Sequence, residues 1–196
     1  KIMKAAVIII AVALCFVLAD KAYAQRALPG MQGLQITGGM VDGIWSKDNS
    51  NESGYYFGAA MATYSKNANK WVFGAEYLRR NYSYENGNIP VEQFTGEGGY
   101  YYNFLSSRGK VVCFSIGASA LAGYETVNRG EKQLDDGATL RNEDGFLYGG
   151  ALTLEMESYI TDRIVLLLTG RERMLQGTTT GHFHAQFGIG LKFIIN

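Results

Sequence analysis

The chain has 196 residues, with 18 Lys and Arg against 18 Asp and Glu, 25 glycines and 13% aromatic residues. This length suits a single domain, and the balanced charge lacks the clustered Lys and Arg of a nucleic-acid-binding face. Beyond the N-terminal segment, no stretch approaches the roughly 18 unbroken apolar residues of a transmembrane helix.

The N-terminus has the pattern of a secretory signal peptide. The stretch "KIMKAAVIIIAVALCFVLADKAYAQ" begins with Lys1 and Lys4, continues with an apolar run and ends with "AYA" before Gln25. Charged, apolar and small-x-small segments in this order are typical of a cleaved export signal. We therefore expect residues 1–24 to be a signal peptide, and residues 25–196 to form one mature domain without an internal disulfide. The alternative is a retained N-terminal helix.

The mature sequence alternates between apolar and polar residues in eight segments. In the last one, Phe187, Ile189 and Leu191 alternate with Gln186, Gly188 and Gly190. Because successive side chains of a strand point to opposite faces, this alternation predicts strands with one apolar side. The predicted strands cover approximately residues 31–43, 54–66, 70–82, 91–106, 110–126, 145–159, 163–175 and 181–195.

The connections between these segments alternate in length. Short turns lie at "KNAN", "SSRG" and "ITD", whereas the other connections are the longer polar stretches "IWSKDNSNES", "SYENGNIP", "VNRGEKQLDDGATLRNED" and "QGTTT". Short turns at one rim, longer loops at the other and an even number of strands predict an all-β protein. The predicted fold is an eight-stranded antiparallel outer-membrane β-barrel with both termini in the periplasm. A soluble lipocalin-type barrel is the alternative.

The distribution of glycine and charge indicates which face lies inside. The non-apolar face of the segments is rich in glycine and carries a nearly balanced set of charges, which is unusual for a surface in water. The interior of an eight-stranded barrel has room only for its own side chains, so this face fits inside and the apolar face outside. We expect a structural charge network in the lumen, formed by Glu76, Arg80, Glu97, Glu155, Glu157, Arg171, Arg173 and Lys192.

Specific ion pairs are expected within this network, because a buried charge without a partner is costly. We predict that Glu155 and Glu157 face Arg171 and Arg173 across the hairpin that turns at "ITD", and that Lys192 extends the network. A path for protons or ions through the lumen is the functional alternative to this structural interpretation.

Aromatic residues of the apolar face divide into two groups. One group lies near the short turns and the other near the long loops, with aliphatic residues between them. Two aromatic belts around an aliphatic band are typical of a protein that crosses both interfaces of a bilayer. The short-turn belt comprises Trp71, Phe73, Tyr100, Tyr102, Phe104 and Phe193, and the long-loop belt comprises Tyr55, Phe94, Phe146 and Tyr148.

Candidate catalytic and metal-binding residues are few. His182 and His184 are the two histidines, and a lipid-modifying barrel enzyme would need such a group near the membrane. Strand alternation points both imidazoles inward, which favours hydrogen bonding in the lumen over catalysis. No third metal ligand has a suitable spacing, and "QLDDGATLRNED" lacks the ligand pattern of a calcium loop. We expect no cofactor and no bound metal.

Four stretches carry a resemblance to a known family: "KNANKWVFGAEY", "FTGEGGYY", "SIGASALAGYETVN" and "HFHAQFGIGLKFIIN". Together they resemble the TraO family of conjugative-transposon proteins from Bacteroidetes, over nearly all of the mature region. The resemblance implies a place among the components of a type IV secretion-like apparatus, and it implies no catalytic residues.

We therefore predict a non-enzymatic outer-membrane component of a conjugative DNA-transfer apparatus, with a structural or assembly role. Its expected partners are outer-membrane lipid and other conjugation subunits, without direct nucleic-acid binding. Eight strands leave no channel wide enough for DNA, so the barrel is not expected to be the conduit. The alternative is a lipid-modifying enzyme of the same architecture.

Overall fold

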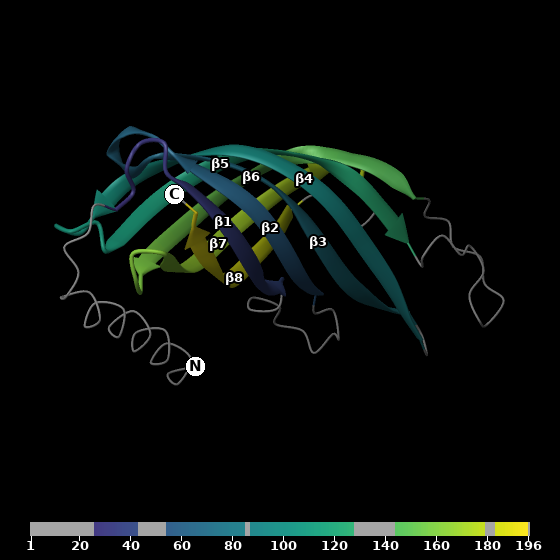
Figure 1. Ribbon diagram of the computed structural model, residues 1–196. Helices are drawn as coiled ribbons and strands as arrows, with labels where there is room; N and C mark the ends of the chain where they lie inside the picture. The colour runs from purple at the N-terminus through teal and green to yellow at the C-terminus, as the bar shows by residue number, and fades with distance from the viewer. Residues whose placement is uncertain (1–25, 43–53, 85–86, 128–143, 179–182, 196) are drawn as a thin grey trace.

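A computed structural model describes residues 26–42, 54–84, 87–127, 144–178 and 183–195, so the predicted signal peptide lies outside the described residues. Eight antiparallel strands form one closed barrel, in agreement with the predicted fold (Figure 1). The strands are β1 (Gln32–Val41), β2 (Gly54–Tyr64), β3 (Lys70–Tyr84), β4 (Gly87–Ser106), β5 (Val112–Val127), β6 (Gly145–Tyr159), β7 (Ile164–Gln176) and β8 (Phe183–Ile194). None of the described residues forms a helix long and apolar enough to cross a membrane.

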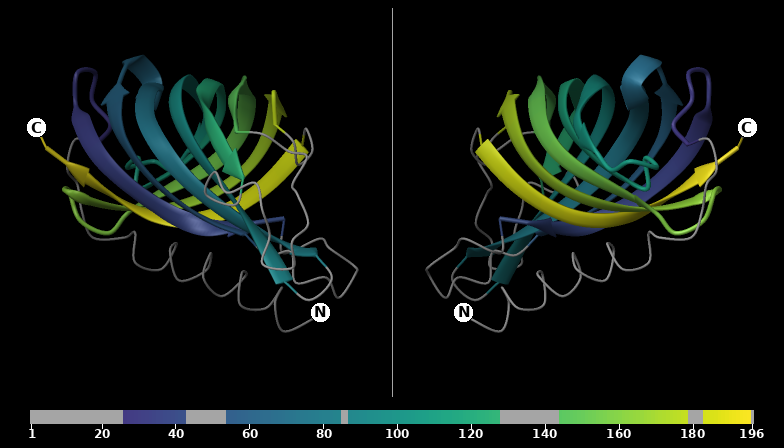
Figure 2. Two further views of the ribbon diagram at one scale, coloured as in Figure 1. Left: turned by 90° about the vertical axis from the view of Figure 1, so that its right-hand side faces the viewer. Right: turned by 90° about the vertical axis from the view of Figure 1, so that its left-hand side faces the viewer.

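Each strand pairs with its neighbours in the sequence, and β1 pairs with β8 to close the barrel. The turns β2–β3, β4–β5 and β6–β7 lie together at the left end of the barrel in Figure 1. The short helix η1 (Lys66–Ala68) lies in the first of these turns. The two views of Figure 2 show the strands strongly inclined and curved around the lumen.

The hairpin β3–β4 is longer than predicted. The sequence placed a loop at "SYENGNIP", but β3 continues to Tyr84 and β4 begins at Gly87. Pro90 pairs with Asn81 of β3, whereas the pairing of β4 with β5 begins one residue later at Val91. Pro90 therefore lies at the start of β4, where the strand has a neighbour on one side, and sheets tolerate proline at such positions. The prediction of a loop at this proline was wrong for that reason.

The two faces of the barrel differ in polarity as predicted. On β2, Tyr56 is 4% exposed and points into the lumen, whereas the next residue, Phe57, is 61% exposed and points outward. The same alternation continues around the barrel, where Lys70, Glu157 and Lys192 are fully buried while Ile36 and Leu154 are exposed. The charged residues are thus inside and the large apolar side chains outside, the reverse of a soluble barrel.

Glycines make room for the large side chains of the narrow lumen. A Cβ atom added at Gly117 would lie 2.6 Å from the ring of Tyr101, its cross-strand partner on β4. A Cβ atom at Gly39 would lie 2.0 Å from the backbone oxygen of Phe187 on β8. The glycine content of the inward face therefore follows from close packing inside a small barrel.

The residues before β1 close the short-turn end of the lumen. Ala27 is buried in an apolar cluster, and Arg26 reaches Asp162 in the β6–β7 turn at 3.2 Å while lying over the ring of Tyr159. The amide of Gly30 donates a hydrogen bond to the carbonyl of Tyr64. The apolar cluster comprises Ala27, Tyr64, Ala68, Tyr159, Val165, Leu167 and Ile194.

Introducing a charged residue on the outer face tests whether that face contacts lipid or water. We expect Leu154→Arg, at a position that is 59% exposed between the two ends of β6, to lower the free energy of unfolding in lipid vesicles by about 2–4 kcal/mol. The control Ser106→Arg, at the end of β4, should change it by less than about 0.5 kcal/mol. Urea unfolding of the vesicle-inserted protein measures both, and equal stability of the two variants would contradict a lipid-facing surface.

Candidate functional site

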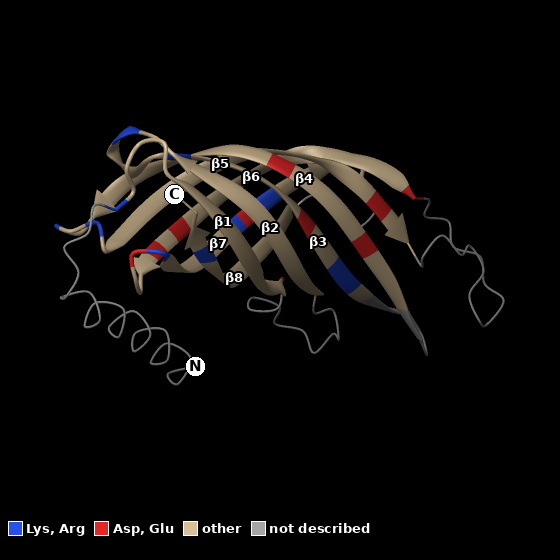
Figure 3. Ribbon diagram, viewed as in Figure 1, with Lys and Arg blue, Asp and Glu red and all other residues tan. Residues whose placement is uncertain are grey.

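The lumen contains a cluster of two lysines and two glutamates near the short turns. Lys70 of β3 contacts Glu155 and Glu157 of β6, with its Nζ atom 2.6 Å from Oε1 of Glu157. Lys192 of β8 forms an ion pair with the same Glu157 oxygen. Two positive and two negative charges thus compensate one another in a space from which solvent is excluded. Figure 3 shows the charged residues of the strands along the barrel wall.

Tyrosines enclose this first cluster. The Tyr64 hydroxyl donates a hydrogen bond of 2.9 Å to Glu157 and accepts one from Tyr159 at 3.3 Å. Lys70 lies 5.5 Å from the ring centroid of Tyr101 and 5.8 Å from that of Tyr64, so both lysine and carboxylate have partners beyond the ion pair itself. Additional hydrogen bonds and cation–π contacts of this kind offset part of the desolvation of buried charges.

A second balanced cluster lies farther toward the long loops. Arg171 of β7 contacts Glu76 of β3 at 3.3 Å and Glu97 of β4 at 3.0 Å. Arg173 contacts the other oxygen of Glu76 at 2.9 Å, and that oxygen also accepts a hydrogen bond of 2.8 Å from Gln186. Because these pairs join opposite sides of the barrel, they connect its wall across the lumen.

The third cluster lies at the mouth of the lumen beside the long loops. Asp42, directly after β1, contacts Arg80 at 2.7 Å and Nδ1 of His184 at 3.0 Å, and it accepts a hydrogen bond from the Ala185 amide. Burial favours the neutral form of Asp42, but the hydrogen bonds from His184 and Ala185 and the charge of Arg80 hold the pKa of its carboxyl below the ordinary value. This cluster ties the ends of β1, β3 and β8 together.

The space between the first two clusters is small. A cavity of about 20 Å³ lies between the first two clusters, among Gln35, Tyr56, Glu97 and Tyr101. That volume is enough for one water molecule, and the buried Gln35 side-chain oxygen has no hydrogen-bond partner within the described chain. This part of the lumen therefore admits single water molecules and not a macromolecule.

The ion pairs differ from the predicted ones. Glu155 stands opposite Thr169 and Glu157 opposite Leu167, so the register of the β6–β7 hairpin does not bring them to Arg171 and Arg173. The predicted pairing was wrong because it considered neighbouring strands alone. In a narrow barrel, long side chains also reach strands on the other side of the lumen, and these contacts determined the partners.

All eight charged residues of the predicted network point into the lumen, but Lys70 and Asp42 were missed. Lys70 directly follows the polar turn "KNAN" and was assigned to the strand without a role, although alternation places it on the same face as Glu76. Asp42 was within the first predicted strand and lies just beyond the end of β1. Tyr64 and Tyr101 were also missed, although their position in the alternation places them on the inner face, where both are buried.

Of the two histidines, the structure describes only His184. His182 lies outside the described residues. His184 points inward as predicted and is 4% exposed, and its contacts are with Asp42 and Arg80. No group of three or more potential metal ligands occurs among the described residues, and Cys113 is buried with a free thiol.

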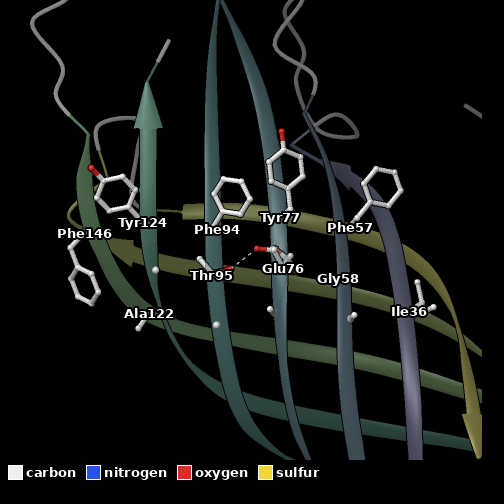
Figure 4. Close-up of a pocket in the computed structure, with 14 residues that line it drawn as sticks. Ile36, Phe57, Gly58, Glu76, Tyr77, Phe94, Thr95, Ala122, Tyr124 and Phe146 are labelled. Carbon is white, nitrogen blue, oxygen red and sulfur yellow. Dashed lines mark hydrogen bonds between the residues drawn. The ribbon is translucent and has the colours of Figure 1, made fainter. Parts of the chain in front are cut away.

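The outer face carries a row of aromatic side chains across neighbouring strands. Figure 4 shows Phe57, Tyr77, Phe94, Tyr124 and Phe146, which belong to the successive strands β2 to β6 and stand opposite one another in the register. Below this row, Ala59, Ala75, Gly96 and Ala122 form the floor of an open groove of about 770 Å³. Each residue of the predicted belts is on the outer face, and their role at the bilayer interfaces stays a prediction.

The fold defines a class of protein, the small outer-membrane β-barrels. Neisserial surface protein A is similar to the chain over 85% of this chain and 97% of its own, with a TM-score of 0.54 and 11% identity. Ail, the attachment invasion locus protein of Yersinia pestis, is similar over 86% of this chain and 100% of its own, with a TM-score of 0.53 and 12% identity. At these identities the likeness concerns the fold alone.

The model of one protein family, described as conjugative transposon protein TraO, matches residues 28–195. The chain belongs to the TraO family. No curated protein matches the chain. The family suggested by the four sequence stretches is thereby confirmed.

The first charged cluster can be tested by removing one cation. Lys192→Met leaves two carboxylates with Lys70 alone, and we expect a loss of about 3 kcal/mol in the free energy of unfolding, typical of a broken buried ion pair. The double variant Lys192→Met with Glu157→Gln restores charge balance and should recover part of this loss. Guanidinium unfolding in detergent micelles measures each step. Additive effects of the two substitutions would contradict a coupled cluster.

Proposed function

We propose that this protein is a non-enzymatic outer-membrane component that anchors or assembles a conjugative DNA-transfer apparatus. The observation that carries the proposal is a lumen closed by ion pairs, in a chain that belongs to the TraO family. The family match supports a role in conjugation. The closed lumen favours anchoring or assembly over transport through the barrel.

The proposed location is the outer membrane, with both termini in the periplasm. The outer face is apolar, and its aromatic residues lie toward both ends of the barrel. Arg26 and Ile195, the first and last described residues, both lie at the short-turn end, where Ile195 donates a hydrogen bond to Gln32. Short turns are periplasmic in outer-membrane barrels. Partner subunits in the periplasm would therefore approach the end that Arg26 and Ala27 close.

The geometry supports a contact role for the barrel. An eight-stranded barrel has an interior with room only for its own side chains, and the cavity between the first two charge clusters measures about 20 Å³, enough for one water molecule. Moving DNA through it would break two balanced charge clusters and leave buried charges unpaired, which is costly. The proposed partners are outer-membrane lipid and other conjugation subunits, and direct binding of nucleic acid is not part of the proposal.

The arrangement of His184 supports the non-enzymatic role. A lipid-modifying group must reach a substrate in the bilayer, but His184 is on the inner face of β8, and its contacts join it to Asp42 and Arg80. Its Nε2 atom is buried and has no hydrogen-bond partner within the described chain. No hydroxyl or thiol nucleophile contacts it among the described residues.

The proposal predicts the phenotype of a deletion in the donor cell. We expect deletion to abolish transfer of the element and a plasmid copy of the gene to restore it, while the lipid composition of the outer membrane stays unchanged. Mating frequency and mass spectrometry of extracted lipids measure the two readouts. Complementation with His184→Gln, which keeps a donor for Asp42, should restore transfer fully.

Other results would contradict the proposal. An altered lipid profile that His184→Gln fails to correct would favour a lipid-modifying enzyme. Unchanged transfer after deletion would remove the protein from the apparatus. Recovery of the protein in the aqueous fraction without detergent would contradict the outer-membrane location.

A further inference from the structure

Two carboxylates of the barrel wall point away from the lumen, and one of them, Glu92 of β4, pairs with Arg79 of β3. Glu172 of β7 is exposed, and strand alternation places it on the outer face between the inward-pointing Arg171 and Arg173. Its cross-strand partners are Leu152 of β6 and Ala185 of β8, neither of which can accept or neutralise a charge. Glu172 therefore stands in an apolar part of the surface.

Glu172 also lies inside the long-loop aromatic belt. The next outward residue of β7 toward the long loops is Met174, which pairs with Gly150 and Phe183, and Tyr148 of β6 pairs with Gln176 beyond it. Phe183 and Tyr148 are both more than half exposed. In the proposed membrane orientation these aromatic rings mark the interface, and Glu172 lies on its hydrocarbon side.

No described residue forms an ion pair or a hydrogen bond with the Glu172 side chain, whereas the carboxylates inside the lumen contact cations. Ionisable groups that face hydrocarbon are costly, and in membrane proteins they mark functional contacts. The surroundings of Glu172 leave space for such a contact. Gly170 precedes it on the same face, and a Cβ atom added there would meet nothing nearer than 3.6 Å. Small residues such as Gly170 and Ala185 let another backbone approach closely.

A second copy of the chain does not fit this face. A two-fold interface places the same surface against itself, so Glu172 would meet a second Glu172 or its apolar neighbours. The described cations near the outer surface lie elsewhere: Arg79 pairs with Glu92 at the long-loop rim, and Lys66, Arg108, Lys110 and Arg163 belong to the short turns. Charge complementarity instead calls for a cation from another polypeptide.

From these observations we infer that the outer face of β7 around Glu172 is a docking surface for a membrane-embedded segment of another conjugation subunit. That segment presents Lys or Arg at the depth of Glu172 and packs against Gly170 and Ala185. The inference rests on the proposed function, because it takes both the bilayer orientation and the conjugation partners from it.

Photo-cross-linking in donor cells with the complete conjugation gene set tests the surface. A photoreactive residue in place of Met174, beside Glu172, should form an adduct with one conjugation subunit, identified by mass spectrometry. The same residue in place of Phe73 on β3, on the opposite side of the closed barrel, should not. Glu172→Leu should lower the adduct yield by about tenfold, the factor for losing one charge-assisted hydrogen bond, and the isosteric Glu172→Gln should lower it less.

Exchanging the charges of Glu172 and its partner is the decisive test of the docking surface. Glu172→Lys should abolish the adduct, and replacing the facing cation of the identified subunit by Glu should restore it. Heat-dependent gel mobility verifies that every variant is a folded barrel.

Three outcomes would overturn the inference: adducts with lipid only, an adduct with a second copy of this chain, or an unchanged yield in Glu172→Leu. If deletion still abolishes transfer in those cases, the docking surface is wrong and the proposed function stands. If deletion has no effect on transfer, the proposed function itself fails.

Discussion

The balance of charge inside a closed lumen is the constraint on which the rest of this structure depends. A buried charge is tolerated when a partner and further hydrogen bonds replace its water. Lys70 and Lys192 face Glu155 and Glu157, and Arg171 and Arg173 face Glu76 and Glu97, so each cluster is neutral by itself. Long charged side chains then fill most of the interior, and the glycines beside them provide the remaining space.

The polar, filled interior is accompanied by an apolar outer face. Since the charged side chains of the three clusters find partners within the lumen, the outer face is free to be apolar, and it carries aromatic residues toward both ends. Such a surface matches a bilayer and leaves the rims and selected outer positions for contacts with other proteins. The chain belongs to the TraO family, and in the proposed function these contacts are with other conjugation subunits.

Local periodicity was enough to predict the strands and their two faces, because alternation with period two is a property of each strand alone. It failed where pairing or contact between distant parts of the chain determines the structure. Pro90 belongs to β4 because it pairs with Asn81 of β3, one residue before the pairing with β5 begins. Glu157 binds Lys70 and Lys192 because β3 and β8 reach it across the lumen. Glu172 interrupts the apolar outer pattern, and its position became clear when the register placed it between Leu152 and Ala185.

The stretch before β1 has a consequence for the order of folding. Arg26 contacts Asp162, which is 136 residues away in the sequence, and its neighbour Ala27 packs among residues of β2, β6, β7 and β8. Contacts between such distant residues form late, because the chain entropy lost in bringing them together is large. The site that receives Ala27 is complete only when β2, β6, β7 and β8 have come together. The docking of this stretch and the closure of the barrel between β1 and β8 both rest on contacts between distant residues, so both belong to the late steps of folding.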